Sequence, residues 1–366
     1  MDIKDSKLNY LKQLDGVRAI AITLVIIWHY FYQLTGDYSE GPMKYIKFIT
    51  SWTWSGVDLF FILSGFLIGR ILINNKGSEN YFKTFYLKRI FRIFPAYYLV
   101  LFVYIIFILT GISANFPWLF ENQFSVLPYF LFLQNFWMVI YGFGSHWLVV
   151  TWTLAVEEQF YLLLPLLIYF VRLKSLPKIL ITGVILAPVI RALYVEGAYV
   201  LLPTRMDSLL SGVLIAYFYL NGSLIKFFSG KQKYLIAVLV ALFIFIFNYK
   251  RLDYLRFGGV YIQALLVFFY SMSVVFLLTN TNKFLQSLFS NSIMSFIAKI
   301  SYMLYLTHQI FSGLLHQLIL NQSPQLNNYN DIAVTLLSLI VTIAFCTVSY
   351  KLLESPFINF GKRYKF

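Results

Sequence analysis

Long apolar runs separated by short polar segments set the pattern of this chain. The runs fall at about residues 14–34, 55–73, 93–110, 149–171, 179–194, 205–220, 234–248, 260–279, 300–320 and 332–353. A helix needs about 20 mostly apolar residues to cross a bilayer, so the runs predict transmembrane helices. One further apolar stretch, about residues 124–141, contains Pro128, Gln134 and Asn135 and is short for a span, which predicts a re-entrant or interfacial helix. The predicted fold is an all-α integral membrane protein with about ten transmembrane helices and this short extra element.

The amino-acid composition supports the same class. Of the 366 residues, 60% are hydrophobic and 12% are charged, whereas a soluble domain has about 25% charged residues. The mean hydropathy is +0.72. No stretch is long and polar enough for a separate soluble domain, so residues 1–366 are expected to form a single polytopic domain. The one cysteine, Cys346, excludes an internal disulfide framework and a cysteine metal cluster.

Positive charges between the apolar runs predict the topology. Segment 76–92 carries five Lys and Arg residues, and such residues collect in cytoplasmic loops. This places both termini in the cytoplasm and makes the cytoplasmic membrane the expected location. The net charge of +14 then reflects Lys and Arg residues in cytoplasmic loops. It implies contact with membrane lipids and not with nucleic acid. Lys250, Arg251 and Arg256 are an exception, because this topology places them outside.

The first apolar run carries three ionisable side chains, Asp15, Arg18 and His29. Ionisable groups within a membrane span are costly, so each is a candidate functional residue. Arg18 and His29 are eleven residues apart, which places them on nearly the same helix face, about 16 Å apart along the axis. Asp15 lies one turn before Arg18 and can pair with it.

Several motifs follow one another over nearly the whole chain: Leu-Asp-Gly-Val-Arg-Ala-Ile-Ala at 14–21 followed by His29, Gly-Val-Asp-Leu-Phe-Phe-Ile-Leu-Ser-Gly-Phe-Leu-Ile at 56–68, Lys-Arg-Ile-Phe-Arg-Ile-Phe-Pro-Ala-Tyr at 88–97, Trp-Thr-Leu-Ala-Val-Glu-Glu-Gln-Phe-Tyr at 152–161, Arg-Met-Asp-Ser-Leu-Leu-Ser-Gly at 205–212, Ser-Tyr-Met-Leu-Tyr-Leu-Thr-His at 301–308 and Glu-Ser-Pro-Phe at 354–357. Together these motifs resemble those of the membrane-bound acyltransferase family 3. The resemblance implies about ten helices and transfer of an acyl group, usually acetyl from acetyl-CoA, to a hydroxyl of a surface carbohydrate. Some relatives add an esterase-like domain, whereas this chain resembles the stand-alone members.

His29 is the best candidate for the general base of such a transfer. The reaction needs a base for the hydroxyl proton and a group that stabilises the tetrahedral oxyanion, and imidazole titrates near neutrality. A histidine that only joins two helices by a hydrogen bond is the alternative, and the resemblance favours catalysis. Direct attack by the acceptor and a covalent acyl-enzyme both remain open.

Arg18 and Glu157 complete the predicted catalytic set. Arg18 could hold donor phosphate or set the electrostatics of the pocket; alternatively, it snorkels to the cytoplasmic interface beside Asp15. Glu157 could orient His29 or bind the acceptor sugar. An acid near the positive end of a helix is the alternative, and it suits the neighbouring Glu158 better.

Arg89 and Arg92 are predicted to bind the donor. They are three residues apart, so both point to one side at the cytoplasmic end of the third run. Coenzyme A carries phosphates, and guanidinium groups bind phosphates through paired hydrogen bonds. From charge alone an anchor on anionic lipid headgroups is favoured, whereas the resemblance favours binding of acyl-CoA.

A second group of residues is assigned to the substrate with less support. Its members are Asp58, Arg205, Asp207, Tyr302, Tyr305 and His308. Arg205 with Asp207 could be a structural pair, and the two tyrosines share a helix face on which they could stack on a sugar ring or only pack. His146 could line an outer vestibule, and His316 is unassigned. The four histidines are scattered and no His-Glu-x-x-His occurs, so no metal site is predicted.

The sequence therefore predicts a membrane O-acyltransferase that uses acetyl-CoA or another acyl-CoA as donor. Its acceptor is a carbohydrate, which could be linked to a lipid. A transporter or flippase for a glycan or small anion is the first alternative, because it could also use buried charges. A non-catalytic scaffold or sensor is the second. Turnover of acyl-CoA separates the enzyme from both.

Overall fold

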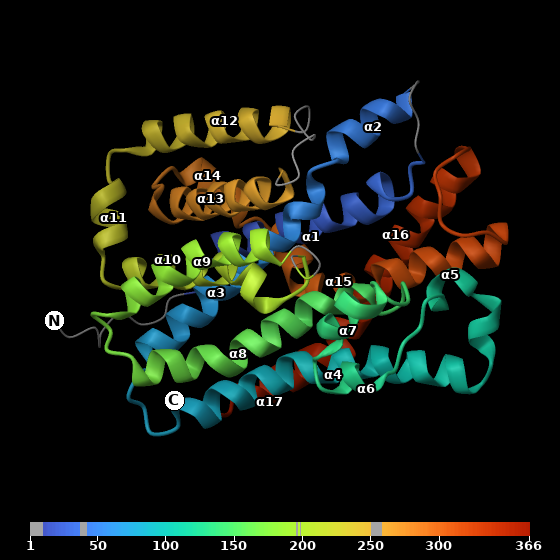
Figure 1. Cartoon of the computed structure of the whole chain (residues 1–366), viewed down its shortest axis with the longest axis horizontal. Coiled ribbons are helices and arrows are strands. Elements are labelled where there is room, and N and C mark those ends of the chain that lie inside the picture. Colours follow the sequence, from blue (N-terminus) through green and yellow to red (C-terminus); the bar gives the residue numbers. More distant parts are fainter. Residues whose placement is uncertain (1–9, 37–41, 195–196, 198, 250–257) are drawn as a thin grey trace. The chain divides into compact units, whose positions relative to one another are not determined.

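Figure 1 shows a computed structural model of the protein, which describes residues 10–36, 42–194, 197, 199–249 and 258–366. These residues form helices and contain no strand. The exceptional basic cluster of Lys250, Arg251 and Arg256 lies outside the described residues.

Each apolar run of the sequence overlaps a long helix. These helices are α1 (Gln13–Ile27), α3 (Gly56–Asn74), α4 (Tyr81–Leu109), α8 (Trp152–Phe170), α9 (Leu176–Leu193), α10 (Leu202–Leu220), α12 (Gln232–Tyr249), α13 (Gly258–Thr279), α15 (Ser292–Leu320) and α16 (Tyr329–Ser349). Among the described residues, seven helical stretches are long and apolar enough to cross a membrane; they contain α1, α3, α4, α8, α9, α13 and α16. The all-helical prediction is confirmed, whereas the count of ten crossings stays a prediction.

Shorter helical segments join the long helices. They are the π-helix η1 (Trp28–Tyr32), α2 (Pro42–Thr50), η2 (Thr53–Ser55), η3 (Ile112–Asn115), α5 (Pro117–Phe120), α6 (Leu127–Phe130), α7 (Gln134–Tyr141), η4 (Val149–Thr151), α11 (Ser223–Phe228), α14 (Lys283–Phe289), the π-helix η6 (Tyr350–Glu354) and α17 (Ser355–Gly361). The predicted re-entrant or interfacial stretch consists of α6 and α7. Neither is long enough to cross a bilayer.

Two boundaries differ from the pattern of apolar runs. Residues 42–50 fall between two runs and nevertheless form α2, whose Tyr45, Phe48 and Ile49 are exposed. Helix α4 begins at Tyr81, twelve residues before the third run, and includes the basic segment. Lys and Arg are good helix formers, so positive charge marks the end of the apolar run without ending the helix.

The chain divides into two compact units built from interleaved segments. The first unit takes residues 1–21, 55–81 and 156–298, and the second takes residues 22–54, 82–155 and 299–366.

In the first unit, glycines bring the backbones of α3 and α10 together. A Cβ atom on Gly65 would overlap the carbonyl oxygen of Leu209, and one on Gly212 would lie 2.6 Å from the backbone nitrogen of Phe66. Gly69, four residues after Gly65, faces Val213 in the same way. Small residues spaced by four allow such close packing between membrane helices, where dispersion contacts replace the hydrophobic effect. The matched positions increase together along both helices, so α3 and α10 are parallel.

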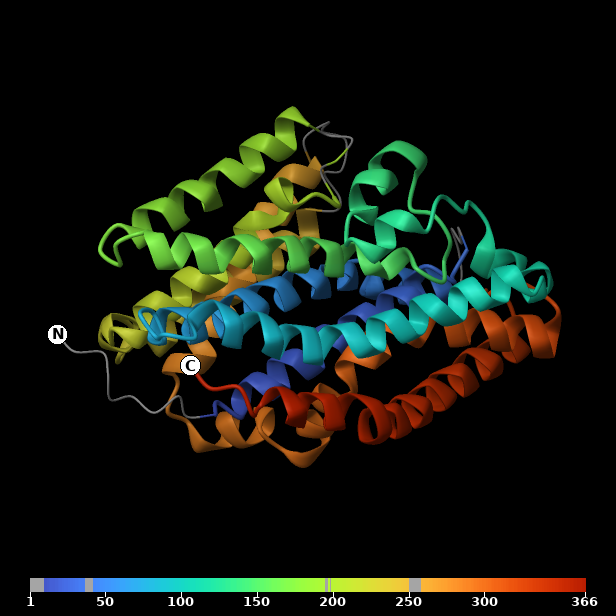
Figure 2. The same ribbon diagram turned by 90° about the horizontal axis from the view of Figure 1, so that it is seen from below.

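In the second unit, α15 and α16 form an antiparallel pair, visible in orange and red in Figures 1 and 2. The Thr307 hydroxyl lies 3.5 Å from the Cys346 sulfur, and the ring centroids of Phe311 and Phe345 are 5.0 Å apart. Helix α17 packs on α4, where Gly361 faces Phe91. The second unit contains three of the predicted catalytic and donor residues, namely His29, Arg89 and Arg92.

Candidate functional site

The predicted base, His29, lies in the π-helix η1 at the end of α1. A π-turn widens the helix locally, and such turns often occur at functional sites. The His29 side chain is half-buried, and its Nδ1 lies 2.9 Å from the carbonyl oxygen of Val25. The same nitrogen lies 3.1 Å from Nε2 of His308 on α15. The structure therefore joins two predicted site residues that are 279 positions apart in the sequence.

His308 is fully buried and has a defined hydrogen-bonding environment. Its Nδ1 lies 2.8 Å from the carbonyl oxygen of Tyr305 and 3.1 Å from that of Leu304. Carbonyl oxygens only accept hydrogen bonds, so Nδ1 carries the proton. In a neutral imidazole the other nitrogen is then an acceptor, and Nε2 of His308 presents a lone pair to His29.

The tautomer of His29 follows from these contacts. Its Nδ1 faces two acceptors, the Val25 carbonyl and Nε2 of His308, so Nδ1 carries the proton. The neutral ring therefore has its basic lone pair on Nε2. No described residue makes a hydrogen bond to this Nε2.

Tyr30 fixes the two histidine-bearing segments to each other. Its buried hydroxyl donates a 2.7 Å hydrogen bond to the backbone carbonyl of His308 and lies 3.4 Å from the Thr342 hydroxyl of α16. Three elements of the second unit, η1, α15 and α16, thus meet at one side chain next to the histidine pair.

Tyr302 and Tyr305 both hold α15 to neighbouring backbone. The Tyr302 hydroxyl donates to the carbonyl of Ile93 on α4 at 2.9 Å. The Tyr305 hydroxyl donates to the carbonyl of Val150 at 3.1 Å and accepts from the Thr153 hydroxyl at 2.9 Å. These contacts support the packing interpretation of the two tyrosines, and stacking on a sugar stays a prediction.

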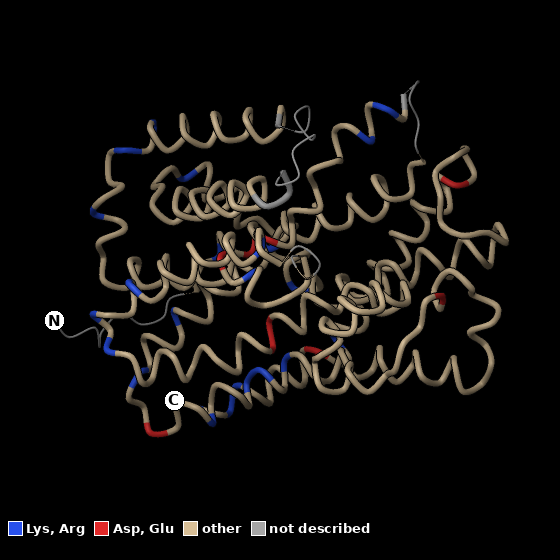
Figure 3. The backbone as a smooth tube through the Cα atoms, in the orientation of Figure 1, with Lys and Arg blue, Asp and Glu red and all other residues tan. Residues whose placement is uncertain are grey.

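The predicted donor arginines occupy the first half of α4. Arg89 and Arg92 are half-buried, and the Arg89 guanidinium lies 6.0 Å from the centre of the Phe85 ring. Figure 3 shows basic positions following one another along this part of the helix. Arg92 interacts electrostatically with Glu354 of η6, a carboxyl that is 4% exposed. The two arginines therefore lie in a strongly positive stretch of the second unit.

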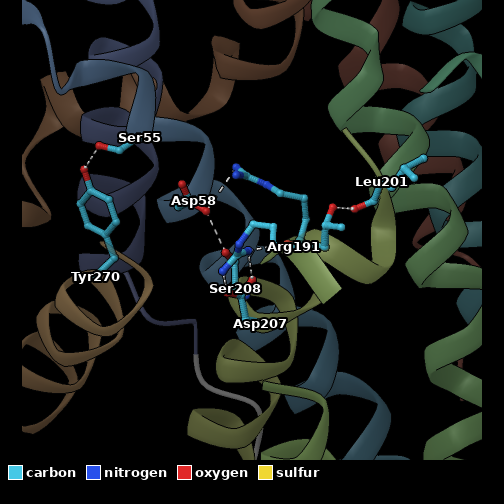
Figure 4. A network of polar contacts seen from close by, with 9 residues as sticks. Ser55, Asp58, Arg191, Leu201, Asp207, Ser208 and Tyr270 are labelled. Atoms are coloured by element: carbon cyan, nitrogen blue, oxygen red, sulfur yellow. Dashed lines mark hydrogen bonds and ion pairs between the residues drawn. The ribbon is translucent and has the colours of Figure 1, made fainter. Parts of the chain in front are cut away.

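In the first unit, Asp58 and Arg205 form a fully buried ion pair between α3 and α10. An Arg205 guanidinium nitrogen lies 3.2 Å from Oδ1 of Asp58, and the Ser208 hydroxyl donates to the same oxygen at 2.8 Å. The Arg205 guanidinium also lies 5.1 Å from the centre of the Tyr199 ring. Figure 4 shows Asp58 and Ser208 of this network, together with the hydrogen bond between Ser55 and Tyr270.

A second buried pair joins Arg191 of α9 to Asp207 of α10. The guanidinium donates to Oδ2 at 2.6 Å and to Oδ1 at 3.2 Å, and also to the carbonyl of Thr204. Arg205 and Asp207 thus each have an ion-pair partner on another helix. Arg191 is not among the residues predicted from the sequence, although an arginine inside an apolar run is a signal that could have identified it.

Arg18 and Glu157 also belong to the first unit, and both are half-buried. The Asp15 carboxylate accepts hydrogen bonds from the hydroxyls of Tyr10, at 2.5 Å, and Ser295, at 3.3 Å. The pairing of Asp15 with Arg18 stays a prediction. His29 belongs to the second unit, so a shared role with Arg18 or Glu157 is also a prediction.

His146, in the segment between α7 and α8, stacks on Trp118 with ring centroids 4.0 Å apart. Burial lowers the pKa of the His146 imidazole below its usual value, and the Glu121 carboxylate, 3.4 Å away, opposes this effect. Its Nδ1 lies 3.0 Å from the carbonyl of Trp118. These contacts give His146 a structural role in the loop.

Comparison with known proteins identifies the family. A family model described as an acyltransferase domain matches residues 11–351. The chain belongs to the acyltransferase 3 family. Together with its long apolar helices, membership makes this acyltransferase-family chain an integral membrane protein.

Several relatives of this acyltransferase-family chain have O-acetyltransferase names. A Staphylococcus aureus protein with a provisional O-acetyltransferase name is 27% identical over 98% of this chain and 59% of its own length. The peptidoglycan O-acetyltransferase OatA of Listeria monocytogenes is 28% identical over 98% of this chain and 58% of its own length. The O-acetyltransferase OatA of Staphylococcus aureus is 25% identical over 97% and 60%. The chain thus spans about six-tenths of the length of these relatives. No solved structure matches it.

Proposed function

We propose that the protein is an O-acyltransferase of the cytoplasmic membrane. It moves an acetyl or other short acyl group from cytoplasmic acyl-CoA to a hydroxyl of a surface or lipid-linked carbohydrate. Membership of the acyltransferase 3 family supports the reaction, and the name of the Listeria relative favours peptidoglycan as the acceptor. The observation that carries the proposal is the His29 tautomer, whose hydrogen bonds leave Nε2 as the basic nitrogen.

In the proposed reaction, the acceptor oxygen attacks the carbonyl carbon of the thioester while its proton passes to Nε2 of His29. The tetrahedral intermediate then collapses, the carbon–sulfur bond breaks, and the departing thiolate takes the proton from Nε2. The base is thereby returned to its starting state. Arg18 and Glu157 are proposed to support this centre, Arg18 by its charge and Glu157 by orienting His29 or the acceptor.

Arg89 and Arg92 are proposed to bind the phosphates of coenzyme A. Their guanidinium groups fit planar, paired hydrogen bonds to phosphate oxygens, and the surrounding basic segment adds favourable charge. Asp58, Arg205, Asp207, Tyr302 and Tyr305 remain proposed contributors to the acceptor site. Replacing both Arg89 and Arg92 with alanine should weaken acyl-CoA binding, and unchanged affinity would contradict the donor assignment.

We also propose ten membrane crossings with both termini in the cytoplasm, the termini being those of this sequence. Helices α10, α12 and α15 would add three crossings to the seven candidate spans. The parallel packing of α3 with α10 and the antiparallel packing of α15 with α16 support these directions. That residues 1–366 form a single polytopic domain is also part of this proposal.

The test is acetyl release from labelled acetyl-CoA by the purified protein, beside His29→Ala. The expected result is turnover by the wild type and its loss in a folded His29→Ala variant. His316→Asn is the matched control, because His316 is a buried histidine on α15 outside the proposed site. Membranes that contain native glycans are added as a source of acceptor. If the protein neither binds nor turns over acetyl-CoA in their presence, the enzyme assignment is wrong. That result would favour a transporter, which family membership does not favour.

A further inference from the structure

We infer that His308 is a positioning residue that holds His29 in the Nδ1–H tautomer, so that Nε2 of His29 is the basic nitrogen that accepts the proton of the acceptor hydroxyl. This inference rests on the proposed role of His29 and replaces a substrate-binding role for His308. It is carried by the 3.1 Å contact between Nε2 of His308 and Nδ1 of His29.

The environment of His308 allows only one polarity for this contact. Its Nδ1 lies against two carbonyl oxygens of its own helix, from Leu304 and Tyr305. The other tautomer would set a lone pair against these oxygens, and a flipped ring would set a C–H group there, in a site with no solvent exposure. A buried polar group without a partner costs about 1–3 kcal/mol, so Nε2 of His308 stays an acceptor.

The backbone around His308 is held as firmly as its ring. The Tyr30 hydroxyl donates to the His308 carbonyl at 2.7 Å, and Tyr30 directly follows His29 in η1. The contact therefore fixes the segment that carries the base relative to the segment that carries its acceptor. A rigid acceptor keeps the imidazole in a single orientation, which is the supporting role that an orienting group has in a catalytic triad.

The pair also defines where positive charge develops. When Nε2 of His29 takes the proton of the acceptor hydroxyl, the ring becomes an imidazolium with Nδ1–H still between the Val25 carbonyl and Nε2 of His308. Neither partner carries a formal negative charge. Because both partners are neutral, the imidazolium is not stabilised by an opposite charge at Nδ1. The proton on Nε2 can therefore be transferred to the departing thiolate.

Two substitutions separate the acceptor function of His308 from its bulk. A glutamine side chain can place its amide oxygen where Nε2 of histidine lies, whereas an asparagine side chain reaches only as far as Nδ1. His308→Gln should therefore retain turnover within a few-fold. His308→Asn should lower kcat on the order of 10²-fold, within the 10²–10⁴ that general base catalysis contributes, while KM stays roughly unchanged.

The tautomer itself can be observed in detergent-solubilised protein by ¹⁵N NMR of ring-labelled histidine. His29→Gln assigns the His29 signals by their disappearance. In the wild type and in His308→Gln we expect the Nδ1–H form of His29. In His308→Asn the Val25 carbonyl still accepts from Nδ1 but the second acceptor is lost, so we expect the Nε2–H form to gain population. His316 is the internal control, because its Nδ1 lies 2.9 Å from the Ser312 carbonyl and its Nε2 lies 3.1 Å from the Thr335 hydroxyl. Its signals should not change.

The outcomes distinguish this inference from the proposed function. If His29→Ala turns over acetyl-CoA like the wild type, the proposed base is wrong. If His29→Ala is inactive while His308→Asn keeps wild-type kcat and the Nδ1–H tautomer, only the positioning role is wrong. A raised KM with unchanged kcat in His308→Asn would also overturn the inference, because it would assign His308 to substrate binding.

Discussion

Replacing Asp207 with asparagine should strongly destabilise the packing of α9 against α10. Arg191 and Asp207 are 1% and 2% exposed, and two hydrogen bonds of 2.6 and 3.2 Å join them. Asparagine keeps the size of the side chain, but it removes the negative charge and turns one acceptor into a donor facing the guanidinium. The substitution therefore leaves a buried cation without its counter-charge.

The size of the effect follows from the kind of contact that is lost. Removing one partner of a buried ion pair costs about 3–5 kcal/mol. Ordinary hydrogen bonds between membrane helices average about 0.6 kcal/mol, because the separated helices find other partners in the membrane. We expect a loss of about 3–5 kcal/mol, several times the value for an ordinary contact.

The measurement is reversible unfolding in detergent micelles, followed by circular dichroism. Glu79→Gln removes one negative charge at an exposed position and should change stability by no more than about 0.5 kcal/mol. The double variant Arg191→Met with Asp207→Leu should recover most of the lost stability, since apolar residues often replace a buried pair without loss. A cost below about 1 kcal/mol for Asp207→Asn would refute the reasoning, because it would mean that the Arg191 guanidinium is solvated.

Three further changes test other contacts. Gly65→Ala should cost about 1–3 kcal/mol of stability in the same unfolding assay, because its Cβ meets the Leu209 carbonyl; an unchanged midpoint would mean that α3 and α10 are further apart. Tyr30→Phe should cost about 1 kcal/mol through loss of the hydrogen bond to the His308 carbonyl, and a neutral effect would argue against that bond. His146 has a lowered pKa in the folded protein, so the unfolded state binds more protons and stability should fall as the pH drops below about 6.5; His146→Gln should reduce this slope, and equal slopes would contradict the burial of the ring.

The positions of the long helices could be predicted from the sequence because membrane helices must be apolar over a fixed length. The exact beginning of α4 could not, since its first twelve residues are helical although they include four Lys and Arg residues. Helix formation depends on backbone hydrogen bonds, whereas the apolar run reports only on contact with lipid.

The pairing of distant side chains was beyond the sequence. His29 and His308 were both recognisable as histidines inside apolar runs, but their contact depends on how η1 packs against α15. Arg205 and Asp207 are near neighbours in the sequence, and each has an ion-pair partner on a different helix, Asp58 and Arg191. Residues two positions apart on a helix point to nearly opposite sides, so Arg205 and Asp207 face different neighbours. Which neighbour each one meets depends on how the helices pack.

The ion pair between Asp58 and Arg205 has a consequence for how the protein is made. The two residues are about 150 positions apart, so at a synthesis rate of about 5–20 residues per second the arginine emerges on the order of ten seconds after the aspartate. During this interval α3 enters the membrane with an acidic side chain whose partner does not yet exist. The lateral assembly of α3 with α10 is therefore a late step of biogenesis, and the insertion machinery or neighbouring lipid headgroups must accommodate α3 until α10 arrives.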